Sequence, residues 1–320
     1  MRLFLIASLI LAVGASTELE QWETFKQTYG KSYKSIAEEE KRFTIFKENV
    51  EHIAKHHEKY KNGESTFTME INEFADMTDG EYNALFTFQP IGSFKDEYGL
   101  KNVANVRNLP TSVDWRKKGA VSELVRSTGG CGASWAFSAT AAVEAQLYIK
   151  KGNLTLLSPQ DLIDCANATF GNHGCYEGSA INAFNYIRRF GIVSEKQYGY
   201  EARQGACRQR GVGVRISGFT KIPSYDEQSL LIAAATIGPV SVAIDASSLK
   251  FYRSGIIDNY SGCRSEFRYL NFEAIIVAYD ADSWTLKNCW GPYWGENGYF
   301  RLQRNTNTCG VALRAAYPVL

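Results

Sequence analysis

The residue best placed for covalent chemistry in this chain is Ser134, in segment 130–138 (GCGASWAFS). A serine hydroxyl is a weak nucleophile unless an adjacent base accepts its proton. The chain has 4 histidines, and beyond residue 108 only His173 remains, in a Gly-rich loop segment. We interpret His173 as a solvated loop residue, and no motif places a lysine beside Ser134. The segment therefore combines a candidate nucleophile with no evident base.

Segment 130–138 resembles the nucleophile segment of the papain-like cysteine proteases. Their pattern Cys-Gly-[Ser/Ala]-Cys-[Trp/Tyr] carries the attacking thiol at its second Cys, where this chain has Ser134. The resemblance implies a histidine base, and counting back from Tyr279 places Phe272 at its position. A shift of one residue would place Glu273 there instead. We favour Phe272, with Glu273 on the opposite face of a strand.

The other two roles in such a site are an asparagine that orients the base and a glutamine that helps to hold the oxyanion. By the resemblance, Asn288 keeps the first position, in segment 284–291 (WTLKNCWG), and Thr128 replaces the glutamine. Trp290 and Trp294 match the aromatic shield over the asparagine. The cleft segment of the family continues here as Tyr176-Glu177-Gly178, which keeps one glycine but adds bulk and charge at the cleft rim.

A second resemblance covers residues 17–108, which contain no Cys. Apolar residues at helical spacing predict an amphipathic helix from Ile36 to Tyr60. An interrupted pattern is similar to that of the inhibitory proregion of cathepsin L-like proteases, with His57 in place of its final Asn. A shorter motif follows, with Glu70 where Gly is usual. The matching residues of the two motifs are Glu38, Arg42, Phe46, Asn49 and Ile53, then Asn72, Phe74 and Asp76.

The N-terminal segment, the cysteines and the glycosylation sequons of the chain indicate the secretory route. Residues 1–16 have a basic start, a short apolar run and a small-residue exit, as a cleaved signal peptide has. The 7 cysteines predict three disulfides and one free thiol. The resemblance implies the pairs Cys131–Cys175, Cys165–Cys207 and Cys263–Cys309, which leaves Cys289 free and, we expect, buried. Asn153, Asn167 and Asn259 begin glycosylation sequons.

The two resemblances together imply an α+β, papain-like two-domain fold behind a helical proregion. We expect a signal peptide at 1–16, the proregion at 17–108 and a peptidase-like region at 109–320, with a helical half at about 116–220 and a β-barrel-like half at about 221–320. Helices are predicted at 134–151, 158–165 and 178–190. Short β-branched or aromatic runs predict strands at 240–244, 274–278, 284–287 and 299–302.

Composition limits the classes of function. The net charge of +1 argues against nucleic acid or a membrane surface as partner. No metal or cofactor is expected, because disulfide-paired cysteines and one histidine do not suit zinc and no nucleotide-binding loop is present. We expect a monomer, secreted to the extracellular fluid or gut lumen, or sent to the lysosome.

Three changed roles at one site predict a catalytically inactive homologue, a pseudoprotease that binds peptides, proteins or protease inhibitors in its cleft, besides its own proregion. The alternative is an endopeptidase of low activity. A storage or structural protein is the third reading.

Overall fold

The computed structural model describes residues 17–86, 108–209 and 211–320. The predicted signal peptide lies outside the described residues. So does all but the last residue of the exposed connector that Pro, Gly and charged residues predict at 88–108. The α-helices are α1 (Glu18–Thr28), α2 (Ile36–Lys61), α3 (Asp79–Asn83), α4 (Ser134–Lys151), α5 (Pro159–Cys165), α6 (Ala180–Phe190) and α7 (Glu227–Thr236). The strands are β1 (Phe67–Met69), β2 (Val113–Asp114), β3 (Gly218–Ile222), β4 (Val240–Ile244), β5 (Tyr252–Ile257), β6 (Phe272–Tyr279), β7 (Ser283–Lys287), β8 (Tyr299–Gln303) and β9 (Ala315–Val319).

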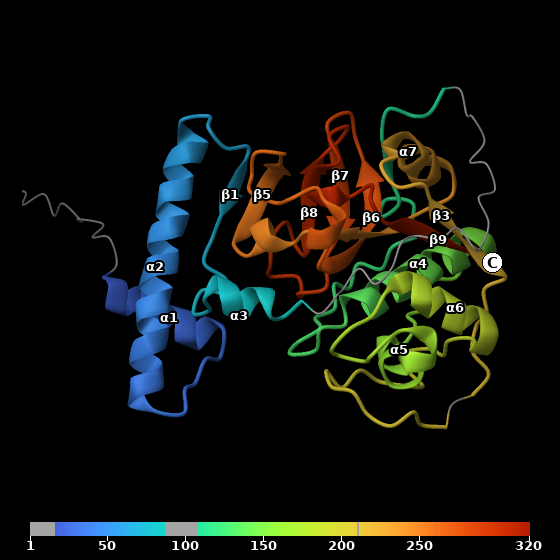
Figure 1. Cartoon of the computed structure of the whole chain (residues 1–320), viewed down its shortest axis with the longest axis horizontal. Coiled ribbons are helices and arrows are strands. Elements are labelled where there is room, and N and C mark those ends of the chain that lie inside the picture. Colours follow the sequence, from blue (N-terminus) through green and yellow to red (C-terminus); the bar gives the residue numbers. More distant parts are fainter. Residues whose placement is uncertain (1–16, 87–107, 210) are drawn as a thin grey trace, which may run out of the picture.

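The proregion forms a separate layer at one end of the molecule, where α1 and α2 lie beyond β1 (Figure 1). Ser35 begins α2 by accepting the Glu38 backbone N–H, as N-cap serines do. The buried face of α2 joins residues of α1 in a small core that also includes Phe251 of the later region. Its buried members are Trp22, Phe25, Phe46, Ile53, Ala75 and Phe251.

The remainder of the chain has a helical half and a half built on one sheet, with α4, α5 and α6 beneath the strands in Figure 1. The strand order is β1-β5-β8-β7-β6-β4-β9-β3, and β2 pairs with β6. All these pairs are antiparallel except β5 with β8. Strand β1 comes from the proregion, so the proregion extends the sheet of the peptidase-like region.

Most predicted elements are present, and the differences have local causes. Helix α4 has the predicted bounds and ends at Gly152 in the left-handed conformation, with φ 72°. Helices α5 and α6 begin one and two residues later than predicted, because Ser158 and Ser179 are their N-caps. Helix α7 was not predicted, and it lies inside the half expected to be sheet.

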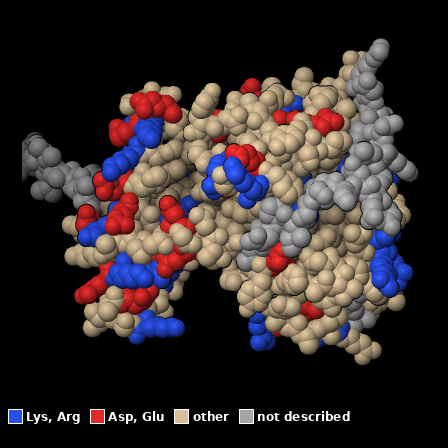
Figure 2. All heavy atoms as spheres, in the orientation of Figure 1, with Lys and Arg blue, Asp and Glu red and all other residues tan. Residues whose placement is uncertain are grey.

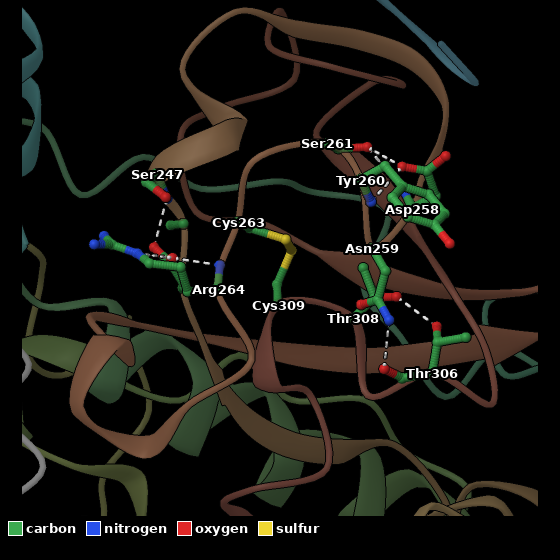
Figure 3. Close-up of a disulfide and its surroundings, with 12 residues drawn as sticks. Ser247, Asp258, Asn259, Tyr260, Ser261, Cys263, Arg264, Thr306, Thr308 and Cys309 are labelled. Atoms are coloured by element: carbon green, nitrogen blue, oxygen red, sulfur yellow. Dashed lines mark hydrogen bonds and ion pairs between the residues drawn. A yellow bond between two sulfur atoms is a disulfide. The ribbon is translucent and has the colours of Figure 1, made fainter. Parts of the chain in front are cut away.

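The structure contains the three implied disulfides, and Cys289 is free and buried. Figure 3 shows Cys263–Cys309 beside a loop that carries Asn259, whose Nδ2 donates to Thr306 O at 3.1 Å. Asn153, Asn167 and Asn259 are exposed, so these sequons remain predictions that the fold allows.

Figure 2 shows acidic and basic side chains mixed over α1 and α2, and fewer charges over the sheet on this face. Over the described ranges, no helix combines the length and apolar character that a bilayer crossing requires. The same residues contain no cluster of three or more His, Cys, Asp or Glu side chains that would suit a metal ion.

Candidate active site

Ser134 is the first residue of α4, and it is buried. Ala133 precedes it as the N-cap and offers no capping side chain. The first amide groups of a helix have no intrahelical acceptors, so this end favours negative charge. Such a site would stabilise a thiolate, but the Ser134 hydroxyl is neutral. Its Oγ accepts the Glu273 backbone N–H at 3.2 Å.

Phe272 begins β6 and has 2% of its surface exposed. Its ring centroid lies 5.1 Å from that of Trp290. Ser134, Phe272, Thr128 and Trp290 line one cavity of about 310 Å³, so the structure brings these four predicted site residues together. The predicted base position thus contributes to this cavity a hydrocarbon ring that cannot accept a proton.

Asn288 follows β7 and is buried, but it does not line this cavity. Its Oδ1 accepts the Cys289 N–H at 2.7 Å, and its Nδ2 has no hydrogen-bond partner among the described residues. Trp290 and Trp294 meet edge to face at 4.8 Å. An orienting amide thus remains in place without an imidazole to hold, and burial raises the pKa of the neighbouring Cys289 thiol.

Thr128 is held through its backbone. Its N–H donates to Cys289 O at 2.9 Å, and its carbonyl accepts the Tyr200 hydroxyl at 2.7 Å. These bonds connect the oxyanion position to the Asn288 segment. Sequence reasoning did not identify Tyr200, because a tyrosine far along the chain carries no pattern that indicates this contact.

Glu273 points to the other face of β6, as predicted. Its Oε2 accepts the Ala180 N–H at the start of α6 at 2.7 Å, and Arg314 donates to the adjoining Ser179 Oγ at 2.8 Å. Burial raises the pKa of Glu273 to about 7, although the charge of Arg314 opposes this shift. Glu273 is thus engaged with α6, and only its backbone contacts Ser134.

Tyr176, Glu177 and Gly178 of the predicted cleft loop do not line the cavity beside Ser134, although the Cys131–Cys175 disulfide joins the loop to the cavity wall. Tyr176 is 76% exposed, so its place at the rim remains a prediction. A Cβ on Gly178 would lie 2.4 Å from the Trp135 ring. The glycine is therefore required here by the packing of Trp135, independently of any substrate. His173 is exposed on the same loop.

Proregion side chains complete the cavity. Phe74, Met77, Leu85 and Phe86 line it from the proregion side, together with Lys31 and Glu73. Of these, only Phe74 belongs to a motif recognised in the sequence. Phe86 was missed because a single aromatic residue before the connector has no spacing that indicates a partner.

The second proregion motif contacts the peptidase-like region directly. Asn72 Nδ2 donates to Lys250 O at 2.7 Å, and Lys250 Nζ donates to Met77 O at 2.7 Å. The first motif holds the second in place, since Arg42 Nη1 donates to Asp76 O at 3.0 Å and Asn49 Nδ2 donates to Ala75 O, within the second motif, at 2.8 Å. Both motifs therefore make specific contacts in this chain.

Comparison with known proteins places these features in context. Residues 109–319 match the papain family cysteine proteases, and residues 22–82 match the cathepsin propeptide inhibitor domain (I29). A cathepsin L-like proteinase of Phaedon cochleariae is 39% identical, over 98% of each chain. Digestive cysteine proteinase 2 of Homarus americanus is 39% identical, over 97% of this chain and 98% of the relative. The structure of digestive procathepsin L 3 of Tenebrio molitor larval midgut superposes with a TM-score of 0.87 at 43% identity, over 96% of this chain and 100% of that one.

Proposed function

The chain belongs to the papain family of cysteine proteases, and from its altered site we propose that it is a member that does not hydrolyse peptide bonds. One observation supports the proposal: Phe272, which the family pattern assigns to the proton acceptor, is buried against Trp290 and lines the same cavity as Ser134. We propose that the protein instead binds polypeptides, either peptides or protease inhibitors, in the retained cleft.

The chemistry of the site supports this reading. In enzymes of this kind, loss of the nucleophile or of the base alone lowers the rate by roughly 10⁶-fold, and the losses are not additive. Removing one oxyanion donor costs a further factor of about 10² to 10³ when the remaining machinery works. Glu273 does not replace the base, since its carboxylate is bound at the start of α6.

A low-activity endopeptidase is the second candidate, and the comparisons favour it by name. The relatives that match over nearly their whole length are called proteinases, and some are called digestive. Those names also support our proposal that this chain follows the secretory route to a digestive or similar compartment.

Hydrolysis assays separate the two candidates. An added protease first removes the proregion and is then inactivated with an inhibitor. The peptidase-like region is then tested on fluorogenic peptides and on unfolded protein. We expect no turnover above that of the matched Ser134→Ala protein. Turnover that disappears in Ser134→Ala would overturn the proposal. Protein that is inactive and also fails to bind cystatins, substrate peptides or the proregion would support a storage role instead.

A further inference from the structure

The proregion and the peptidase-like region meet through aromatic rings at the cleft. Phe74 and Tyr82 approach Trp290 edge-on, at centroid distances of 5.2 and 6.1 Å. Phe86 stacks with Trp290 at 6.0 Å and meets Phe272 edge-on at 5.7 Å. Offset-stacked and edge-on pairs at such distances are attractive. Phe272 thus has a partner in the proregion as well as in its own half.

The cavity around this contact is apolar on the side of the peptidase-like region. The charged residues that line it, Lys31 and Glu73, both come from the proregion. The remaining lining of the peptidase-like side is Thr128, Ser134, small residues and the two rings of Phe272 and Trp290. A ligand group that enters from the proregion side therefore finds aromatic surface and no charge to pair with.

We propose that Phe272 and Trp290 form an aromatic socket, a binding site for the aromatic side chain of a polypeptide, and that Phe86 occupies it in the full chain. The phenylalanine at the base position then has two consequences. It removes the proton acceptor, and it adds an apolar contact that holds the proregion on the cleft. This inference rests on the proposed function only in that Phe272 is not a catalytic residue.

Proregion release from the cut full-length protein tests the aromatic socket. A protease cleavage sequence placed between residues 87 and 107 separates the two regions without altering Phe86 or Phe272. Dissociation of the cut proregion is then followed by size exclusion and by Trp fluorescence. We expect Phe86→Ala and Phe272→Ala each to speed dissociation. Their effects should be coupled. The dissociation rate of the double variant should be about two- to tenfold lower than the product of the two single rate increases predicts.

Two further sets of variants make the result specific. Phe219→Ala removes a buried ring that packs on Phe184 instead, and it should show no coupling with Phe86→Ala. If Phe272→Ala does not fold, Phe272→His and Phe272→Leu take its place, with the same coupling expected at reduced size. Independent, purely multiplicative effects of the Phe86 and Phe272 variants would overturn the aromatic socket.

The outcome is independent of hydrolysis. A protein that hydrolyses peptides through Ser134 would contradict the proposed function and leave the measured coupling unchanged. A protein that is inactive but shows no coupling would contradict the aromatic socket alone.

Discussion

The proregion interface and the catalytic position lie on the same cleft, but they keep the family pattern to different degrees. At the interface, Asn72 reaches the Lys250 carbonyl and β1 pairs with β5. The strand pairing requires Gly255, because a Cβ there would lie 2.5 Å from the Thr66 carbonyl oxygen. At the catalytic position, Ser134 and Phe272 line one cavity, and we propose that they stand where the family pattern has the nucleophile and the base.

This difference indicates that binding and bond cleavage are separable in this fold. Proregion docking depends on backbone pairing, buried hydrogen bonds and aromatic contacts, none of which needs a thiolate or an imidazole. Catalysis depends on a few groups acting as one unit, so a single replacement removes most of it. Retained docking contacts beside replaced catalytic groups are consistent with use of the protein for binding.

The largest expected effect comes from restoring the catalytic side. The triple variant Ser134→Cys, Phe272→His and Thr128→Gln supplies a thiol, a base and an oxyanion donor. The Asn288 Nδ2, which has no hydrogen-bond partner among the described residues, is then available to orient the base. We expect hydrolysis of fluorogenic peptides to rise at least about 10³-fold over the unaltered protein. Ser134→Cys alone is the matched control and should gain far less, since the thiol would still lack its base. A folded triple variant with no gain would show that the cleft is altered beyond its chemistry.

Elements and residues that belong to local sequence patterns could be predicted from the sequence. Ser134–Lys151 contains no helix breaker until Gly152, so α4 could be predicted completely. Motif spacing placed Thr128, Ser134 and Phe272 at one site, and all three line one cavity; their roles, and that of Asn288, stay predictions. Contacts between remote segments could not be located, as Phe86 on Phe272 and Tyr200 on Thr128 depend on tertiary packing. Helix α7 was missed because its apolar residues are consecutive and do not alternate with polar residues at helical spacing.

Among single substitutions, one at Lys250 should weaken proregion docking most directly. Its side chain is 6% exposed, and its ammonium group donates to Met77 O and to Asp79, an exposed carboxylate. We expect Lys250→Met to weaken proregion docking by about 1.5–3 kcal/mol, mainly through the buried bond to Met77, because exposed ion pairs contribute little. Hydrogen exchange across residues 17–86 of the full chain measures the change.

Arg268→Met provides the control, since Arg268 forms its exposed ion pair with Glu266 of the peptidase-like region and not with a proregion residue. Its effect on exchange in residues 17–86 should be negligible. Equal protection in the Lys250 variant and the unaltered protein would mean that β1 and the aromatic contacts alone hold the proregion.

The catalytic side has its own pH dependence, through Glu273. Because burial raises its pKa to about 7 from 4.5, the folded protein binds this proton more tightly than the unfolded chain does. Stability from this group is therefore full below about pH 4.5 and is lost as pH rises through 7, at up to about 1.4 kcal/mol per unit. Urea unfolding at pH 5 and pH 8 should show the decrease, and Glu273→Gln should flatten it. If the free energy of unfolding of the Glu273→Gln protein changed with pH as much as that of the unaltered protein, other groups would be responsible for the pH dependence.

The docking side should respond to pH in the opposite direction and by the smallest amount. His52 and His56 belong to α2 and line a cavity between α2 and the peptidase-like region, and burial lowers the pKa of both. After proregion release each returns towards about 6.5. The docked state therefore binds these protons less tightly, so docking is strongest above pH 6.5 and weakens as pH falls below it. Because His52 is exposed and His56 is only partly buried, we expect a loss of less than about 1 kcal/mol. Dissociation of the cut proregion at pH 7 and pH 5 measures it, and His52→Gln with His56→Gln should reduce the difference. Faster release at pH 7 than at pH 5 would contradict this sign, and would indicate that a carboxylate whose pKa is raised by burial in the interface, such as Glu70, controls its pH response.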